Sequence, residues 1–211
     1  MDGRHERSRR TRRKIVGAAS DLFITDGYGS TSIAAIADRA GVAVQTVYAT
    51  FGTKRAILAA ALDQAIVGDD TAVVVDKRDW MYAVFNAPSA VERLTAYAGA
   101  VRQILTRAGD MFSVVATAAS VDADVVELAE TTEDRRRTGA RTVIGSVLAV
   151  GTLREGLDPE SAGDLLAMLN SPATFQQLVR RSRWSMDTYQ QWLADTMIRE
   201  LLPPPARRRR S

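Results

Sequence analysis

The 211-residue chain contains no cysteine and only one histidine, His5, which lies in an N-terminal leader. The absence of cysteine excludes disulfides and thiolate metal sites and is typical of proteins from a reducing cytoplasm. With one histidine and no cysteine, the chain lacks the side chains of histidine-based nucleophilic triads and of cysteine proteases. No HExxH zinc motif, Walker phosphate loop or GxGxxG run occurs. The sequence therefore predicts no catalytic residues, no metal site and no cofactor.

Long apolar runs are absent as well, because no uninterrupted stretch approaches the length needed to cross a membrane. The N-terminus is rich in arginine, but no apolar segment of the kind found in secretory signals follows it. We therefore expect a cytoplasmic protein with no membrane partner. The chain is long enough to bury a sizeable core in one large domain or two small ones.

Positive charge is concentrated at the two ends of the chain. The net charge is +3, of which residues 1–55 contribute +5, residues 207–210 contribute +4 and residues 56–206 contribute −6. A basic end attached to an acidic body is typical of a protein that contacts phosphate through one module. The alternative is a pair of solvated charged tails.

The stretch from residue 31 to residue 58 contains two short helical patterns. Gly41 separates them, because glycine enters the left-handed conformation that ends a helix. Thr53 can cap a third helix that starts at Lys54. Two short helices joined by a glycine turn indicate a helix-turn-helix, with an ordinary helical hairpin as the alternative. The apolar positions that define the two patterns are Ile33, Ile36, Ala37 and Ala40, then Val44, Val47 and Phe51.

This stretch resembles the DNA-binding signature of the tetracycline-repressor (TetR) family, in the run T-S-I-x-x-I-A-x-x-A-G-V-x-x-x-T-V-Y-x-x-F-x-x-K-x-x-I-L. Gln45 and Thr50 depart from the family pattern, which commonly has glycine at the first place and an aromatic residue or histidine at the second. The resemblance implies an all-α homodimer, with an N-terminal three-helix helix-turn-helix domain joined to a larger C-terminal helical domain for ligand binding and dimerisation. The matching positions are Thr31, Ile36, Ala37, Ala40, Gly41, Val42, Tyr48, Phe51, Lys54 and Leu58.

We expect four parts along the chain: a flexible basic arm over 1–10, the helix-turn-helix DNA-binding domain over 11–55, the ligand-binding and dimerisation domain over 56–203, and a flexible basic tail over 204–211. Segment 68–88 breaks the helical pattern, and we interpret it as packing against the body or, as a second reading, as a lid. The expected helices cover 11–26, 54–67, 89–108, 110–119, 122–153, 159–170, 172–181 and the residues after 185.

The second short helix of the helix-turn-helix is the predicted reading helix for double-stranded operator DNA. Gln45 can pair with adenine, and Val44 and Ala49 can contact thymine methyl groups. The other predicted DNA-contact residues hold phosphates or flank the reading helix, and they are Thr31, Ser32, Thr46, Tyr48, Thr50 and Lys54.

The resemblance also places a cavity for an unknown small-molecule effector among the helices at 89–108, 110–119 and 122–153. Thr132 and Arg136 share the inward register of the last helix. A buried arginine needs a partner. The candidates for Arg136 are water at the middle of the helix, an internal carboxylate, or an anionic or carbonyl-bearing effector. The apolar and aromatic candidate walls are Phe85, Tyr97, Val101, Met111, Phe112 and Leu128.

Two C-terminal helices carry apolar faces that we expect to exceed what a monomer can cover. By the resemblance, these helices pair across a two-fold axis into a four-helix interface. The predicted interface residues are Leu165, Leu166, Leu169, Tyr189, Trp192, Leu193 and Met197.

These features together predict a ligand-responsive DNA-binding transcriptional regulator, a repressor released from a palindromic operator by a small hydrophobic molecule. One alternative is a constitutive repressor or architectural protein without an effector. A weaker alternative is an enzyme with an unrecognised carboxylate site. The long helical body favours the first function, because DNA contact alone does not require so many residues beyond position 55.

Overall fold

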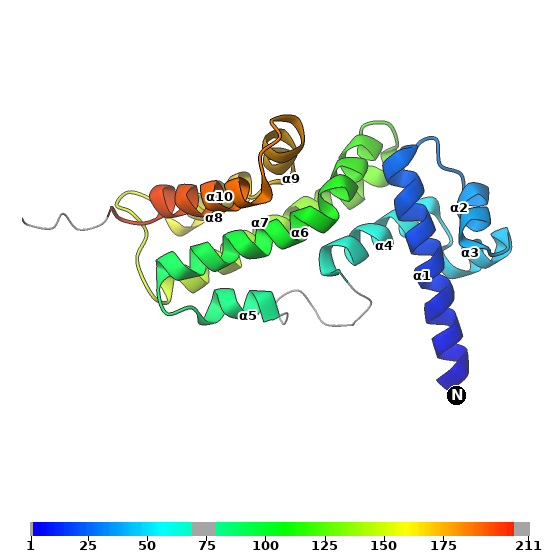
Figure 1. Ribbon diagram of the computed structural model, residues 1–211, viewed down its shortest axis with the longest axis horizontal. Coiled ribbons are helices and arrows are strands. Elements are labelled where there is room, and N and C mark those ends of the chain that lie inside the picture. The colour runs from blue at the N-terminus through cyan, green and yellow to red at the C-terminus, as the bar shows by residue number, and fades with distance from the viewer. Residues whose placement is uncertain (1, 69–78, 205–211) are drawn as a thin grey trace, which may run out of the picture. The chain divides into compact units, whose positions relative to one another are not determined.

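The computed structural model describes residues 2–68 and 79–204, with side chains described for residues 5–68 and 81–204. The described residues are mostly helical and contain no strand, which confirms the all-α prediction. Figure 1 shows their arrangement. In chain order the elements are α1 (Asp2–Thr25), α2 (Ile33–Ala40), α3 (Val44–Phe51), α4 (Lys54–Val67), α5 (Asp79–Asn86), α6 (Ala90–Ala119), α7 (Ala123–Leu148), α8 (Pro159–Leu169), α9 (Pro172–Phe175), the π-helical segment η2 (Gln176–Arg181) and α10 (Met186–Leu201).

The chain forms two compact units. The described part of the first unit comprises residues 2–68 and 107–132, and that of the second comprises residues 79–106 and 133–204. The helices α6 and α7 each contribute residues to both units. These units differ from the domain ranges expected from the sequence, which ended the DNA-binding domain at residue 55. The reason is that segment 107–132 packs into the same core as the N-terminal helices.

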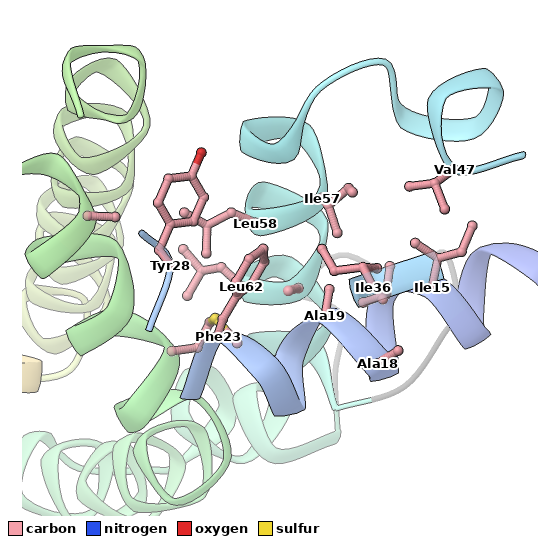
Figure 2. Close-up of a cluster of buried hydrophobic side chains, with 14 of the residues drawn as sticks. Ile15, Ala18, Ala19, Phe23, Tyr28, Ile36, Val47, Ile57, Leu58 and Leu62 are labelled. Atoms are coloured by element: carbon pink, nitrogen blue, oxygen red, sulfur yellow. The ribbon is translucent and has the colours of Figure 1, made fainter. Parts of the chain in front are cut away.

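The core of the first unit gathers side chains from six helices. Figure 2 shows Ile15 and Phe23 of α1 converging with Ile36 of α2, Val47 of α3 and Leu58 of α4. Met111, Val115 and Ala118 of α6 and Val125 of α7 belong to the same buried cluster. Burial of apolar area at about 25 cal/mol per Å² makes such a shared cluster a strong mechanical connection. Segment 107–132 is therefore a structural part of the helix-turn-helix unit.

Short polar residues cap several helices, among them Thr53 at the position expected from the sequence. The Ser32 hydroxyl accepts a hydrogen bond from the backbone N–H of Ala35, and that of Thr53 accepts from Ala56. Such caps satisfy backbone donors that the first turn of a helix leaves without a partner. Gly41 ends α2 with φ at 65°, which is the left-handed conformation expected for that turn. The helix-turn-helix geometry thus follows from local sequence chemistry. The residues that cap α8, α9 and α10 are Asp158, Ser171 and Ser185.

Two helices are longer in the structure than the sequence pattern predicts. α1 begins at Asp2, so residues 2–10, which the sequence analysis expects to form a flexible basic arm, are helical. Ion pairs from Glu6 to Arg9 and Arg13 support this part of the helix. α6 runs through Gly109 without a break, because the flanking Ala108 and Met111 are buried and outweigh the low helix propensity of glycine.

The remaining differences lie further along the chain. α7 ends at Leu148, before the predicted position 153, and a Cβ atom on the following Gly151 would lie 2.9 Å from the Cβ atom of Ala90. The predicted helix over 172–181 divides into α9 and η2. Segment 68–88 contains α5, whereas residues 69–78 and the basic residues 207–210 lie outside the described part of the chain.

Candidate nucleic-acid interface

The reading helix α3 turns one face into the core and presents the other to solvent. Val47 is buried and anchors the helix, and Val44 is half-buried against the same cluster. Gln45, Tyr48 and Ala49 are exposed, and 54% of the Tyr48 side chain is accessible. The structure therefore places an amide, a phenol and a methyl group on one outward surface, which suits contact with base edges and phosphates.

Three hydroxyl residues border this surface. Ser32 is exposed, but its oxygen caps α2. The Thr50 hydroxyl donates to the carbonyl of Thr46 at 2.6 Å, and both threonines are half-buried. The Ser32 hydroxyl accepts from the N–H of Ala35, so its hydrogen can still be donated to a phosphate oxygen, whereas the hydrogen of the Thr50 hydroxyl is engaged with the Thr46 carbonyl. Of these two residues, Ser32 is therefore the better candidate for a phosphate contact.

Thr31 and Lys54 serve the fold rather than the outward surface. Thr31 is buried, and its hydroxyl donates to the carbonyl of Gly27 at 2.8 Å. The Lys54 ammonium donates to the carbonyls of Tyr28 and Thr31 at 2.9 and 3.1 Å, and it lies 4.2 Å from the centre of the Tyr28 ring. This ammonium fastens the first turn of α4 to the loop between α1 and α2. These internal contacts give Lys54 a positioning role, which competes with the phosphate contact expected from the sequence.

The helix α4 is also held by segment 107–132, at both of its ends. In its first turn, Arg55 donates to the carboxylate of Glu127 on α7 at 2.8 Å. In its last turn, the carbonyl of Ile66 accepts from the Arg107 guanidinium on α6 at 3.1 Å. Burial, with smaller contributions from Asp122 and Asp124, raises the pKa of the neighbouring Tyr28 to about 12. A displacement of segment 107–132 would therefore act directly on the helix that follows the reading helix.

The residues predicted to line an effector cavity divide between the two units. Met111 is buried in the core of the first unit, and Phe112 and Leu128 pack against that core. Thr132 is half-buried in the same unit, and its hydroxyl donates to the carbonyl of Leu128. Phe85, Tyr97, Val101 and Arg136 belong to the second unit. The role of these residues in binding an effector stays a prediction.

Arg136 has its partners inside the chain. Its guanidinium donates to both carboxylate oxygens of Glu133, at 3.0 and 2.7 Å, and to the Asn170 side-chain oxygen at 2.5 Å. It also donates to the backbone carbonyl of Ala167 near the end of α8. The hydrogen bonds from Arg136 lower the pKa of Glu133. Of the three partners considered for Arg136, the structure contains the internal carboxylate.

Asn170 extends this network to α6. Its amide donates to the Tyr97 hydroxyl at 2.6 Å, and burial raises the pKa of that phenol to about 12. Asn170 is 5% exposed and was not among the predicted site residues. Its position before Ser171 and Pro172 indicates only a helix end, so the sequence gives no sign of this polar role. The network joins α6, α7 and α8 within the second unit.

Most of the predicted dimer residues are already covered by their own chain. Leu166, Tyr189, Leu193 and Met197 are fully buried, and Leu169 is 8% exposed, in a core that α8, α9 and α10 build together. The premise that these five side chains form an uncovered apolar face is therefore wrong. Leu165 and Trp192 are half-buried, and Met168, which the sequence analysis did not select, is 57% exposed.

One groove of about 290 Å³ lies in the second unit between α7 and the start of α8. None of the predicted effector residues lines it. The groove is lined by Arg141, Ile144, Gly145, Leu148, Pro159 and Glu160.

Within the described residues, no cluster of histidine, acidic or cysteine side chains is arranged to hold a metal ion. Among the described helices, none combines the length and the apolar character needed to span a membrane.

Comparison with known proteins supports the interpretation of the N-terminal residues as a helix-turn-helix that binds DNA. A family model described as bacterial regulatory proteins of the tetR family matches residues 15–61, from the first buried residue of α1 into α4. The chain is 29% identical over 165 residues to YdeS of Bacillus subtilis (strain 168), an uncharacterized HTH-type transcriptional regulator. That match covers 74% of each protein.

Solved structures share the fold over nearly the whole chain. A transcriptional regulator from Saccharomonospora viridis in complex with choline has a TM-score of 0.68 and 21% identity, over 90% of this chain and 96% of that one. The fatty acid degradation regulator FadR from Bacillus halodurans has a TM-score of 0.69 and 14% identity, over 94% of this chain and 97% of that one. At these identities the likeness concerns the fold alone.

Proposed function

This chain belongs to the TetR family of DNA-binding transcriptional regulators, and from that premise we propose that it is a homodimeric repressor, released from a pseudo-palindromic operator in the cytoplasm by a small hydrophobic effector. The observation that carries the proposal is the shared core of the first unit. Segment 107–132 of α6 and α7 packs in one buried cluster with the helix-turn-helix and is bonded to both ends of α4. Any effector that displaces segment 107–132 therefore also displaces α4 and the core that positions the reading helix α3.

Release then follows from linkage. The operator and the effector bind different arrangements of the dimer, so each weakens the binding of the other by the same factor. The effector-binding residues remain those of the predicted set, with Tyr97 and Val101 on the second-unit part of α6 and Met111 on the part that belongs to the DNA-binding unit. A ligand in contact with Met111 or its neighbours in segment 107–132 would act on the unit that holds the reading helix without touching DNA.

The test is release of bound DNA by a panel of compounds. The panel contains choline and a fatty acid, because structural neighbours are a choline complex and a fatty acid degradation regulator, together with neutral hydrophobic compounds. We expect at least one compound to release the protein from duplexes that the protein itself has enriched from a random library. If every compound leaves the complex intact while the protein binds DNA tightly, the constitutive repressor is the better function.

The second expectation concerns the DNA bases that α3 reads through Gln45. The side chain is exposed on the outward face of α3 and can pair with adenine through both its oxygen and its nitrogen. Gln45→Ala should relax the preference at one base pair in each half-site, at a cost of about 1–3 kcal/mol for the preferred base. Selection from a random duplex library measures this preference. Unchanged base preference in Gln45→Ala would remove Gln45 from the interface.

The third expectation concerns dimerisation. The burial pattern leaves accessible apolar side chains on α8, so we place the dimer contact there. We expect Leu165→Glu together with Met168→Glu to give a folded monomer that binds DNA weakly, because both side chains have accessible surface before assembly. Ala173→Glu, at an exposed position on α9, is the control for an added charge. Light scattering reports the mass of each variant. A wild-type monomer at micromolar concentration, or a double variant that remains a dimer, contradicts this interface.

A further inference from the structure

Tyr189 of α10 carries a polar group for which the described residues supply no partner. Its side chain is fully buried in the second unit, and its hydroxyl makes no hydrogen bond. A buried hydroxyl without a partner costs free energy that a phenylalanine of nearly the same shape would avoid. Packing alone therefore does not account for a tyrosine at this position.

A second buried phenol, that of Tyr97 on α6, lies near Tyr189. Arg102 of α6 donates to the Asp187 carboxylate at 2.5 Å and to the Gln190 side-chain oxygen at 3.0 Å, so this stretch of α6 packs along the first turns of α10. The pKa of the Tyr189 phenol is raised above its ordinary value, mainly by burial and further by the neighbouring Tyr97. The two phenols therefore share one part of the core of the second unit.

The Tyr97 hydroxyl has a hydrogen that it does not use. It accepts a hydrogen bond from the Asn170 amide at 2.6 Å, and within the described residues this is its only hydrogen bond. Burial raises the pKa of Tyr97 to about 12, so the phenol keeps its proton at physiological pH. Together, Tyr97 and Tyr189 offer two O–H donors, and neither donor is bonded to an acceptor among the described residues.

This excess of donors selects the kind of oxygen that fits between the two phenols. A water molecule would accept from both phenols, but it would bring two further donors that need acceptors. A carboxylate would add an unbalanced charge to a dry core, because Glu133 already balances Arg136. A neutral carbonyl oxygen accepts two hydrogen bonds and brings neither a donor nor a charge.

We infer that Tyr97 and Tyr189 form the polar end of a binding site for a neutral, hydrophobic carbonyl compound, whose oxygen accepts a hydrogen bond from each phenol. Val101 and Leu193 lie one turn further along the same faces of α6 and α10, and both are buried. The Phe175 ring packs edge to face on Tyr189, with the ring centres 5.2 Å apart. These side chains would cover the apolar part of the compound. The site rests on the proposed response to an effector and names the chemical class of that effector.

Tyr189→Phe is the deciding variant, because it removes the unused hydroxyl and keeps the ring. Since that hydroxyl has no partner in the free protein, the variant should be at least as stable as the wild type in thermal unfolding. Tyr82→Phe, at an exposed position on α5, is the matched control. Calorimetry without DNA measures the binding of cyclohexanone, cyclododecanone and methyl dodecanoate. The comparison compounds are cyclohexanol, cyclododecanol and dodecanoate, which lack a neutral carbonyl group.

We expect at least one carbonyl compound to bind the wild type more tightly than its alcohol or acid counterpart. Tyr189→Phe should bind that compound about fivefold more weakly, which corresponds to the loss of one hydrogen bond, and Tyr82→Phe should bind it as the wild type does. Equal affinity of the wild type and Tyr189→Phe, tighter binding of dodecanoate than of its methyl ester, or no binding of any carbonyl compound would overturn the inference. If a compound releases the protein from DNA and binds Tyr189→Phe unchanged, the response to an effector stands and this site alone is refuted.

Discussion

Replacing Lys54 by methionine is expected to lower the thermal stability of the DNA-binding unit and to weaken binding to every DNA sequence. The ammonium donates to the carbonyls of Tyr28 and Thr31, and both acceptors lose their charged partner in the variant. The Tyr28 carbonyl keeps the backbone N–H of Thr31 as a donor, so the cost comes from the loss of the charged hydrogen bonds and is about 1–3 kcal/mol. The contact of the Lys54 ammonium with the Tyr28 ring is lost at the same time. The free energy of unfolding in denaturant measures the effect.

The salt dependence of DNA binding separates this positioning role from a phosphate contact. Lys54→Met should leave the slope of log affinity against log salt as in the wild type, because the ammonium points into the fold. Lys14→Met is the matched control, since Lys14 is exposed on α1. It should leave the unfolding free energy unchanged and reduce the slope by about 0.9. A Lys54→Met protein of full stability, with a reduced slope, would restore the phosphate role that its sequence position predicts.

Replacing Arg136 by methionine is expected to destabilise the second unit rather than to act only on an effector. The variant removes the donor to the Ala167 carbonyl and to the Asn170 side chain, which is buried. We expect a loss of about 1–3 kcal/mol in the free energy of unfolding. The Glu133 carboxylate is 44% exposed and is rehydrated in the variant, so it adds little to this figure. Equilibrium unfolding in denaturant measures the loss.

Two control variants make the expectation for Arg136→Met specific. Arg137→Met removes an exposed guanidinium that bonds the same Glu133 at 3.3 Å, and it should leave the unfolding free energy nearly unchanged. Tyr97→Phe removes the acceptor for the Asn170 amide, and its effect should not add to that of Arg136→Met, because both act on one network. Equal stability of the Arg136→Met and Arg137→Met proteins would mean that the network contributes nothing.

The pH dependence of stability provides an independent check on Arg136. Hydrogen bonds from Arg136 place the folded-state pKa of Glu133 below its ordinary value. The stabilisation from this pair is therefore fully present above the unfolded-state pKa, and it disappears as the pH falls through the folded-state pKa. Arg136→Met should lose this acid-dependent part of the unfolding free energy, so the difference in stability between the two proteins narrows at low pH to the part that comes from the Ala167 and Asn170 hydrogen bonds.

The sequence predicted the helix-turn-helix because local chemistry determines it. Gly41 adopts the left-handed conformation, Thr53 caps its helix, and the apolar spacing around Val47 places that residue in the core. Each of these features depends on neighbours within a few residues, so periodicity and turn chemistry suffice to find them. The outward residues of α3 follow from the same periodicity.

The roles of Lys54, Arg136 and Asn170 could not be found in this way, because their partners are distant in the chain. Lys54 bonds to carbonyls of a loop that is 23 and 26 residues away, and Asn170 meets Tyr97 from 73 residues away. The sequence shows Lys54 as a positive side chain beside the reading helix and Arg136 as an arginine in an inward register. Because the sequence reveals no internal partner for either residue, both positions favour the prediction of a ligand contact. Burial of Tyr189 and Leu193 likewise depended on the packing of α8, α9 and α10, which no single helical pattern reveals.

The most direct test of the account is selection of duplexes from a random library by the wild-type protein. A regulator that presents one reading helix per protomer in a symmetric dimer should enrich a pseudo-palindrome, with half-sites about 34–36 Å apart along the duplex. Enrichment of two inverted half-sites at that spacing is the predicted result. No enrichment, or enrichment of a single half-site without symmetry by a folded protein, would contradict the claim that α3 reads operator DNA from a homodimer.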